Sequence, residues 1–75
     1  MPLTFATPGS EVKVQEVRGT PDAKQHLIDL GFVIGTPVTV VSSIPTGLIV
    51  KVKQARIAID RSMAAKIMVW IKKEI

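Results

Sequence analysis

The sequence predicts one small, mainly β domain: a five-stranded barrel with a short helix inserted after the first strand and a helical turn before the last. Three observations lead to this fold class. The 75 residues leave room for a single core, and 47% of them are hydrophobic. Apolar and polar residues alternate over several short stretches, as in half-buried strands. Turn residues separate these stretches closely, as in small barrels, where closure removes exposed edges. Residues 1–75 are therefore treated as a single domain.

The first strand is predicted over Glu11–Val17. Val12 and Val14 alternate with charged residues, which is the pattern of a strand with one buried face. Val17 falls out of this phase, which indicates a bulge near Gln15.

A short helix is predicted to follow. Thr20 offers a capping hydroxyl, and Pro21 suits the first helical position. Leu27 lies on the apolar face of this helix, whereas Ile28 points away from that face and is expected to be exposed. Gly31 ends the helix because it adopts a left-handed conformation without a Cβ clash.

Three further strands are predicted over residues 37–42, 48–53 and 56–60. The first two are joined by a turn in which Pro45 presets φ and Gly47 takes a positive φ. Hydrophobic residues alternate with polar ones along each strand, so each should bury one face.

The chain is expected to end with a capped helical turn and a fifth strand. Asp60 can cap a turn over residues 61–66, and the last strand is predicted over Ile67–Ile71. The odd-numbered residues of this strand should face the core, which leaves Met68 and Trp70 on the outer face.

The composition argues against catalysis. Acid–base and nucleophilic chemistry need an activated group with an orienting partner, yet the chain has no cysteine, no tyrosine and one histidine. It also lacks a glycine-rich loop followed by lysine and a hydroxyl residue, so the chain itself is not predicted to be a GTPase. We expect a binding protein, not an enzyme.

Residues 30–50 carry no charge and are long enough to span a bilayer. Three glycines and two prolines interrupt this stretch, and a helix broken so often would leave backbone groups unpaired in lipid. We therefore predict strands and turns here, with no direct membrane insertion. No secretion signal precedes the domain, so a cytoplasmic location is expected.

The charge distribution suggests an acidic or phosphate-rich partner. Residues 51–75 hold seven basic and two acidic side chains, a net charge of +5, whereas residues 1–50 hold three basic and four acidic ones, a net charge of −1. The alternative is a solvated basic face that only keeps the protein soluble.

Six residues are candidates for partner binding, three of them apolar and three basic: Ile28, Val33, Trp70, Lys51, Lys53 and Arg56. Trp and Arg are enriched among the buried anchors of interfaces. The alternatives are that Trp70 covers the open end of the barrel as part of the core and that the three cations are merely solvated. Nucleic-acid binding is the competing function, but three aromatic residues are too few for a stacking platform, so no nucleic-acid partner is predicted.

One weak metal site is conceivable on the helix. Asp22, His26 and Asp29 fall on one helical face, and such a set could bind a divalent transition metal with water completing the coordination. The alternative is a polar outer face, so no cofactor is predicted beyond this weak candidate.

The landmarks of the chain resemble those of the FeoA family, the small cytosolic component of bacterial ferrous-iron uptake. The segments that carry the likeness are Pro8-Gly9, Val12-Lys13-Val14, Leu27-Ile28-Asp29-Leu30-Gly31-Phe32, Gly35 with Val38 and Val40, Ile44-Pro45-Thr46-Gly47, Arg56-Ile57-Ala58-Ile59 and Ala64-Ala65-Lys66-Ile67-Met68-Val69. The Leu-Gly-Phe turn followed by Gly35 is the most specific of these.

The resemblance implies an SH3-like barrel that docks on FeoB, a membrane permease with a cytosolic GTPase part, and thereby sits at the inner membrane through its partner. Ile34 stands where the family often has proline, and Gln54-Ala55 stand where it often has glycine. Without glycine a two-residue turn is disfavoured, so we expect a wider turn between the third and fourth strands. The alternatives are another peptide-binding or nucleic-acid-binding barrel, or the SH3-like domain type of iron-dependent repressors. Homo-oligomerisation is left open.

Overall fold

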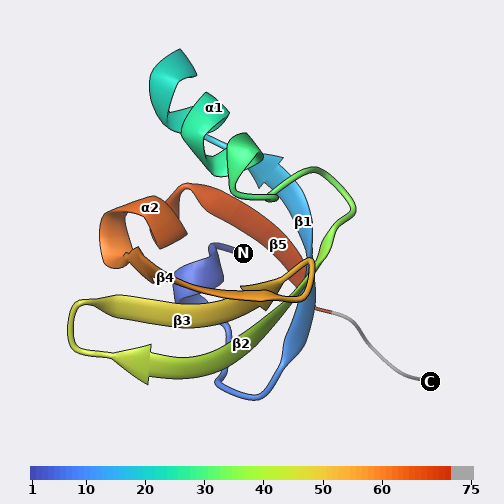
Figure 1. The fold of residues 1–75 in the computed structure, drawn as a ribbon, viewed down its shortest axis with the longest axis vertical. Coiled ribbons are helices and arrows are strands. Elements are labelled where there is room, and N and C mark those ends of the chain that lie inside the picture. Colours follow the sequence, from blue (N-terminus) through green and yellow to red (C-terminus); the bar gives the residue numbers. More distant parts are fainter. Residues whose placement is uncertain (72–75) are drawn as a thin grey trace.

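The computed structural model describes residues 1–71 as a curled sheet accompanied by short helices (Figure 1). The elements in chain order are η1 (Leu3–Phe5), β1 (Glu11–Val17), α1 (Pro21–Asp29), β2 (Pro37–Ile44), β3 (Gly47–Val52), β4 (Ala55–Asp60), α2 (Arg61–Ala65) and β5 (Ile67–Ile71). Three charged residues of the predicted basic third, Lys72, Lys73 and Glu74, lie outside the described residues, as does the side chain of Ile71.

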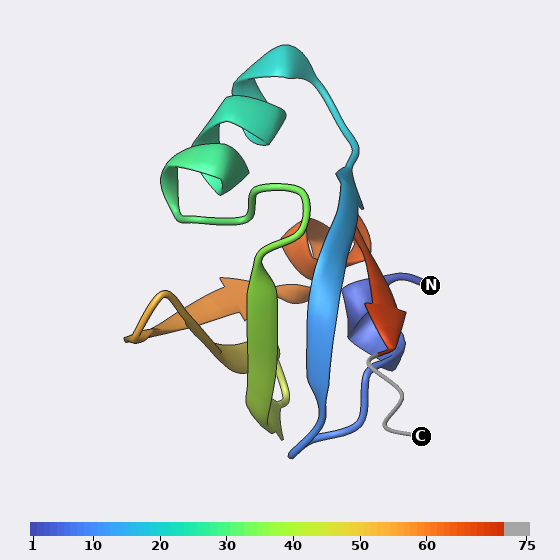
Figure 2. The same cartoon turned by 90° about the vertical axis from the view of Figure 1, so that its right-hand side faces the viewer.

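The five strands form one antiparallel sheet in the order β4-β3-β2-β1-β5. Figure 2 shows β1 and β2 side by side with the β3–β4 hairpin turned steeply across them, so that the sheet curls around its own core. The predicted mainly β fold is confirmed. Complete closure is not, because β4 and β5 lie at opposite ends of the sheet and do not pair. Between them the buried side chains of Leu3 and Ala64, from η1 and α2, fill the space in place of a backbone ladder.

The predicted pattern of β1 is confirmed. β1 buries Val12, Val14 and Val17, and its register against β5 shifts between Val14 and Glu16. This irregularity is the bulge predicted near Gln15, and it brings Val17 back to the core face. The described residues contain no buried polar or charged side chain, so the core is entirely apolar.

Both helices begin at the predicted caps. The hydroxyl of Thr20 accepts a hydrogen bond from the Ala23 amide (3.3 Å), and the carboxylate of Asp60 accepts one from the Met63 amide (2.8 Å). Gly31 ends α1 with a φ of 111°, which confirms its predicted role.

The turn between β3 and β4 is tighter than predicted. Val52 pairs directly with Ala55, so the turn has only two residues, Lys53 and Gln54, with φ values of 49° and 67°. The expected wider turn is therefore wrong. A two-residue turn with positive φ has the same twist as the strands that it joins. Pairing of β3 with β4 therefore keeps two non-glycine residues in the left-handed region.

Gly47 has a different role from the predicted one. Its φ is not in the left-handed region, and it pairs with Ile44 as the first residue of β3. A Cβ at this position would overlap the carbonyl oxygen of Ile59 and lie 2.8 Å from Asp60 Cα. Glycine is therefore needed here for the close approach of β3 and β4, not for its backbone freedom.

The first residues of the chain form part of the fold, which the sequence did not indicate. Leu3 is fully buried. The Val69 amide donates a hydrogen bond to the Met1 carbonyl (2.8 Å), and the Met1 ammonium donates one to the Val69 carbonyl (3.0 Å). Pro2 bridges Met68. Together, Met1 and Pro2 cover part of the outer edge of β5.

Within residues 1–71, none of the helices has the length and apolar character needed to cross a lipid bilayer.

Candidate docking groove

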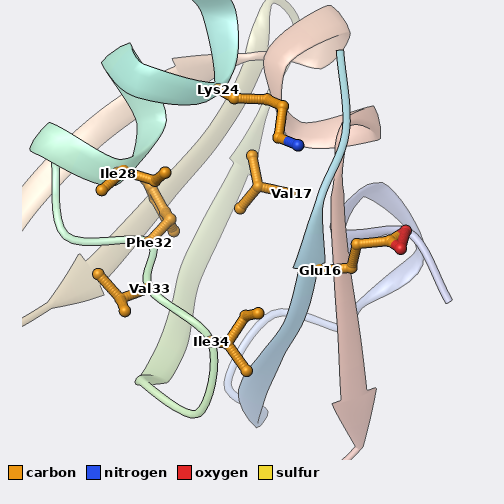
Figure 3. A pocket seen from close by; sticks show the side chains of 7 residues that line it. All are labelled: Glu16, Val17, Lys24, Ile28, Phe32, Val33 and Ile34. Carbon is orange, nitrogen blue, oxygen red and sulfur yellow. The ribbon is translucent and has the colours of Figure 1, made fainter. Parts of the chain in front are cut away.

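An apolar groove of about 320 Å³ lies between α1, the end of β1 and the segment that joins α1 to β2 (Figure 3). Its lining residues are Glu16, Val17, Lys24, Ile28, Phe32, Val33 and Ile34. Five of these seven are hydrophobic, so the groove is suited to an apolar side chain of a partner.

The turn after α1 positions the groove residues. The Gly31 amide donates to the Ile28 carbonyl (2.9 Å), and the Phe32 amide donates to the Leu27 carbonyl (3.0 Å). Leu27 and Phe32 are fully buried and anchor this turn to the core. The anchored turn leaves Ile28 and Val33 on the surface beside the rigid Phe32.

The end of the connecting segment is also fixed by the backbone. The Gly35 amide donates to the Val14 carbonyl of β1 (2.7 Å), and the Thr36 amide donates to the Val33 carbonyl (2.9 Å). Ile34 is held between these two bonds, and its side chain is 69% exposed. A large aliphatic side chain held this openly by a bonded backbone has no evident role in the core.

Ile34 was not among the predicted contact residues. The sequence distinguishes Ile34 only by its position, at which the FeoA family often has proline. The sequence offers one signal that Ile34 is exposed: it is an isoleucine in a connecting segment, outside any alternating pattern, and it follows the candidate contact residue Val33.

The rim of the groove carries one acid and one base. The Glu16 carboxylate accepts a hydrogen bond from Arg18 Nε (2.6 Å). This hydrogen bond, followed by the charge of Arg18, lowers the pKa of Glu16, with a smaller contribution from Lys24. Figure 3 shows Lys24 reaching from α1 toward β1, whereas Glu16 points away from the apolar residues. Lys24 is therefore the rim charge that can favour one orientation of a partner in the groove.

The structure divides the six predicted contact residues among three places. Only Ile28 and Val33, which are 40% and 43% exposed, meet at the groove. Trp70 lies on β5 opposite Lys13 of β1. It is 50% exposed, so its ring is not enclosed in the core.

The three predicted cations lie together at the β3–β4 hairpin. Lys51 is directly opposite Arg56, and Lys53 occupies the turn with its side-chain carbons beside Gly31. β4 and β5 do not pair, so the sheet does not place Trp70 next to Arg56.

The polar face of α1 does not form a ligand cluster. Within residues 1–71, no group of three or more His, Cys, Asp or Glu side chains is arranged to hold a metal ion. The Asp29 carboxylate instead accepts a hydrogen bond from Gln25 Nε2 (2.8 Å). Asp22, His26 and Asp29 share α1, and these three side chains do not form such a group.

The curled five-stranded sheet and the helix after β1 define a small SH3-like domain. Its exposed apolar groove is suited to protein docking. The relatives of the chain agree with this class. A model of the FeoA domain matches residues 1–70, and the chain belongs to the FeoA family.

Individual relatives cover most of the chain. It is 38% identical over 68 residues to a protein of Methanocaldococcus jannaschii named as an Fe(2+) transport protein A, covering 91% of this chain and 83% of that protein. The crystal structure of an iron uptake regulatory protein (FeoA) superposes with a TM-score of 0.85 at 30% identity and covers 92% of each chain. The zinc complex of Stenotrophomonas maltophilia FeoA, described as a prokaryotic SH3 domain protein, has a TM-score of 0.81 at 28% identity, covering 92% of this chain and 88% of that one.

Proposed function

We propose that this protein is a non-enzymatic accessory of ferrous-iron uptake that docks through its groove on the cytosolic GTPase part of a FeoB-type permease. In this role it is a cytoplasmic protein held at the inner membrane through its partner. The observation that carries the proposal is the exposed aliphatic cluster of Ile28, Val33 and Ile34 around the groove. Membership in the FeoA family supports the link to iron transport.

The groove is suited to docking because its base is rigid and its rim is apolar. Phe32 is fully buried beneath the exposed cluster, so little ordering cost is expected when a partner covers it. The three aliphatic side chains expose on the order of 200–300 Å² of apolar surface. Covering this area contributes roughly 5–7 kcal/mol before the costs of association.

Protein docking is favoured over nucleic-acid binding by the placement of the aromatic residues. Of the three, Phe32 is buried, which leaves Phe5 and Trp70 for stacking. Single-strand binders use several aromatics along a basic groove, whereas the groove of this protein is mainly aliphatic. Family membership and the coverage of the Fe(2+) transport protein A favour transport over a repressor domain.

Ile34→Ser tests the proposal. The side chain is 69% exposed, so the substitution should leave stability almost unchanged but weaken binding to the purified permease about tenfold, because an apolar anchor loses its pocket. Phe5→Ser is the matched control, since Phe5 is 73% exposed and does not line the groove. Binding is measured by titrating each variant onto the permease in detergent. Equal affinities of the two variants would exclude the groove as the contact.

A further inference from the structure

We propose that the outer edge of β4 is a second contact surface, at which an extended acidic segment of a partner protein adds to the sheet as a sixth strand. The proposal goes beyond docking at the groove, because it concerns another element and another kind of contact. It rests on the unpaired backbone of β4, on the contrast between the two ends of the sheet and on the cations beside the edge.

The register of the β3–β4 hairpin determines which backbone groups of β4 face outward. In a hairpin with a two-residue turn the closing pair exchanges both hydrogen bonds, and hydrogen-bonded and open pairs then alternate. Val52 and Ala55 close this hairpin, so every second residue of β4, counted from Ala55, bonds to β3. Arg56 and Ala58 therefore turn their N–H and C=O groups away from β3. By this register they do not bond to β3, and within residues 1–71 no backbone hydrogen bond outside the strand ladders reaches these four groups.

The two end strands of the sheet, β4 and β5, differ in how far their outer edges are paired. Part of the outer edge of β5 is covered by Met1 and Pro2 through the bridge to Met68 and the paired bonds to Val69. The edge of β4 has no such backbone partner: α2 packs against β4, but within residues 1–71 it makes no backbone hydrogen bond to Arg56 or Ala58. Charged side chains, proline and bulges protect exposed edges. β4 carries the charges of Arg56 and Asp60, but it contains no proline and its register with β3 is unbroken. The edge is therefore regular enough to accept another strand.

The charges beside this edge favour an anionic occupant. Lys51 and Arg56 are exposed and directly opposite each other, and like charges in this arrangement are destabilising. Neither forms an ion pair within the described part of the chain. Lys53 adds a third positive charge in the adjoining turn. A carboxylate placed opposite Arg56 would relieve this repulsion.

The geometry also specifies the pattern of the occupant. Side chains opposite Arg56 and Ala58 would lie on the outer face of the sheet, where acidic residues meet the cations. The side chain between them would face inward and cover Ile57, which is only half-buried at this open edge. The segment should therefore alternate acidic and apolar residues, and its main chain would bond to Arg56 and Ala58, as in other cases of strand addition.

The experiment uses the whole isolated protein and a short capped peptide of alternating glutamate and valine, so it does not depend on the permease or on the groove. The amide signals of Arg56 and Ala58 should shift in two-dimensional NMR spectra and become protected from solvent exchange. The matching lysine–valine peptide should produce neither effect. Binding of the acidic peptide should weaken as salt is added.

Variants separate edge pairing from general charge attraction. Arg56→Glu should weaken peptide binding roughly tenfold, whereas Lys24→Glu, the same charge change at the groove, should have little effect. Ala58→Pro removes an outward N–H that β3 does not use and should abolish binding. If that variant fails to fold, Arg56→Glu still decides the question.

Several results would overturn the proposal. These are the absence of peptide binding, equal binding of the lysine–valine peptide, or binding that leaves the Arg56 and Ala58 amides unshifted. Signals of these amides that change with protein concentration alone would assign the edge to a second copy of the chain instead.

Discussion

Gly47→Ala would place a methyl group inside the contact between β3 and β4. The atoms in its way are backbone atoms: the Ile59 carbonyl oxygen, which it would overlap, and Asp60 Cα at 2.8 Å. Backbone cannot rotate aside as a flexible side chain can. The two strands must therefore separate, and the hydrogen-bonded pair of Leu48 and Ile59 beside Gly47 is strained first.

The expected cost follows from these two effects. Inserting a methyl group into a packed contact costs about 1–3 kcal/mol, and disturbing one ladder hydrogen bond adds about 0.5–1.5 kcal/mol. We expect Gly47→Ala to lower the free energy of unfolding by about 2–4 kcal/mol. In a domain of this size such a loss lowers the melting temperature by roughly 8–32 °C.

The measurement is urea unfolding followed by far-UV circular dichroism. Gly9→Ala is the matched control, because Gly9 has a φ of 91° and an added Cβ would meet nothing within 4 Å. Its cost comes only from the left-handed backbone, about 1–2 kcal/mol. A loss of stability for Gly47→Ala no larger than that of Gly9→Ala would refute the steric argument.

Two further predictions concern local features of the strands. Gln54→Gly should raise the free energy of unfolding by about 0.5–1 kcal/mol, since Gln54 holds a φ of 67° in the β3–β4 turn and glycine adopts this conformation without strain. An unchanged urea midpoint would mean that the turn is not strained. The pKa of Glu16 is lowered in the folded protein, so its ion pair with Arg18 stabilises the fold at neutral pH, and this contribution is lost as the pH falls through the lowered pKa. Arg18→Gln should return the pKa of Glu16 toward its ordinary value in an NMR titration, and a titration curve that does not move would contradict the assignment.

The sequence was informative where local chemistry decides the structure. Alternation located the strands, and the out-of-phase Val17 located the bulge in β1. Thr20 and Asp60 marked the starts of both helices, because a capping side chain acts within its own turn. The exposure of Ile28 followed from helical periodicity.

What the sequence did not reveal depends on contacts between distant segments. The first residues show no periodicity, yet Leu3 is buried and Met1 pairs with Val69. The need for glycine at position 47 arises from its approach to Ile59, which only the β3–β4 register defines. The tight turn at Lys53 and Gln54 is likewise set by strand twist, against the preference of its own residues.

The candidate site was predicted only in part for the same reason. Ile28 and Val33 meet at the groove because the turn after α1 is anchored in the core. The exposure of Ile34 results from backbone bonds to β1, which its neighbours in sequence do not indicate. The strand order, in which Trp70 on β5 does not neighbour the basic hairpin, is a property that no single strand encodes.

The pairing of Met1 and Pro2 with β5 limits how molecules of this protein can grow into larger β-structures. Fibre growth by edge-to-edge addition requires two available edges on every molecule, one to attach and one to receive the next. Here the chain start occupies one of them along Met68 and Val69, so addition at β4 ends after a single step. Displacing these two residues would expose the edge of β5. Each molecule would then have two free edges, and strand addition could continue from one molecule to the next.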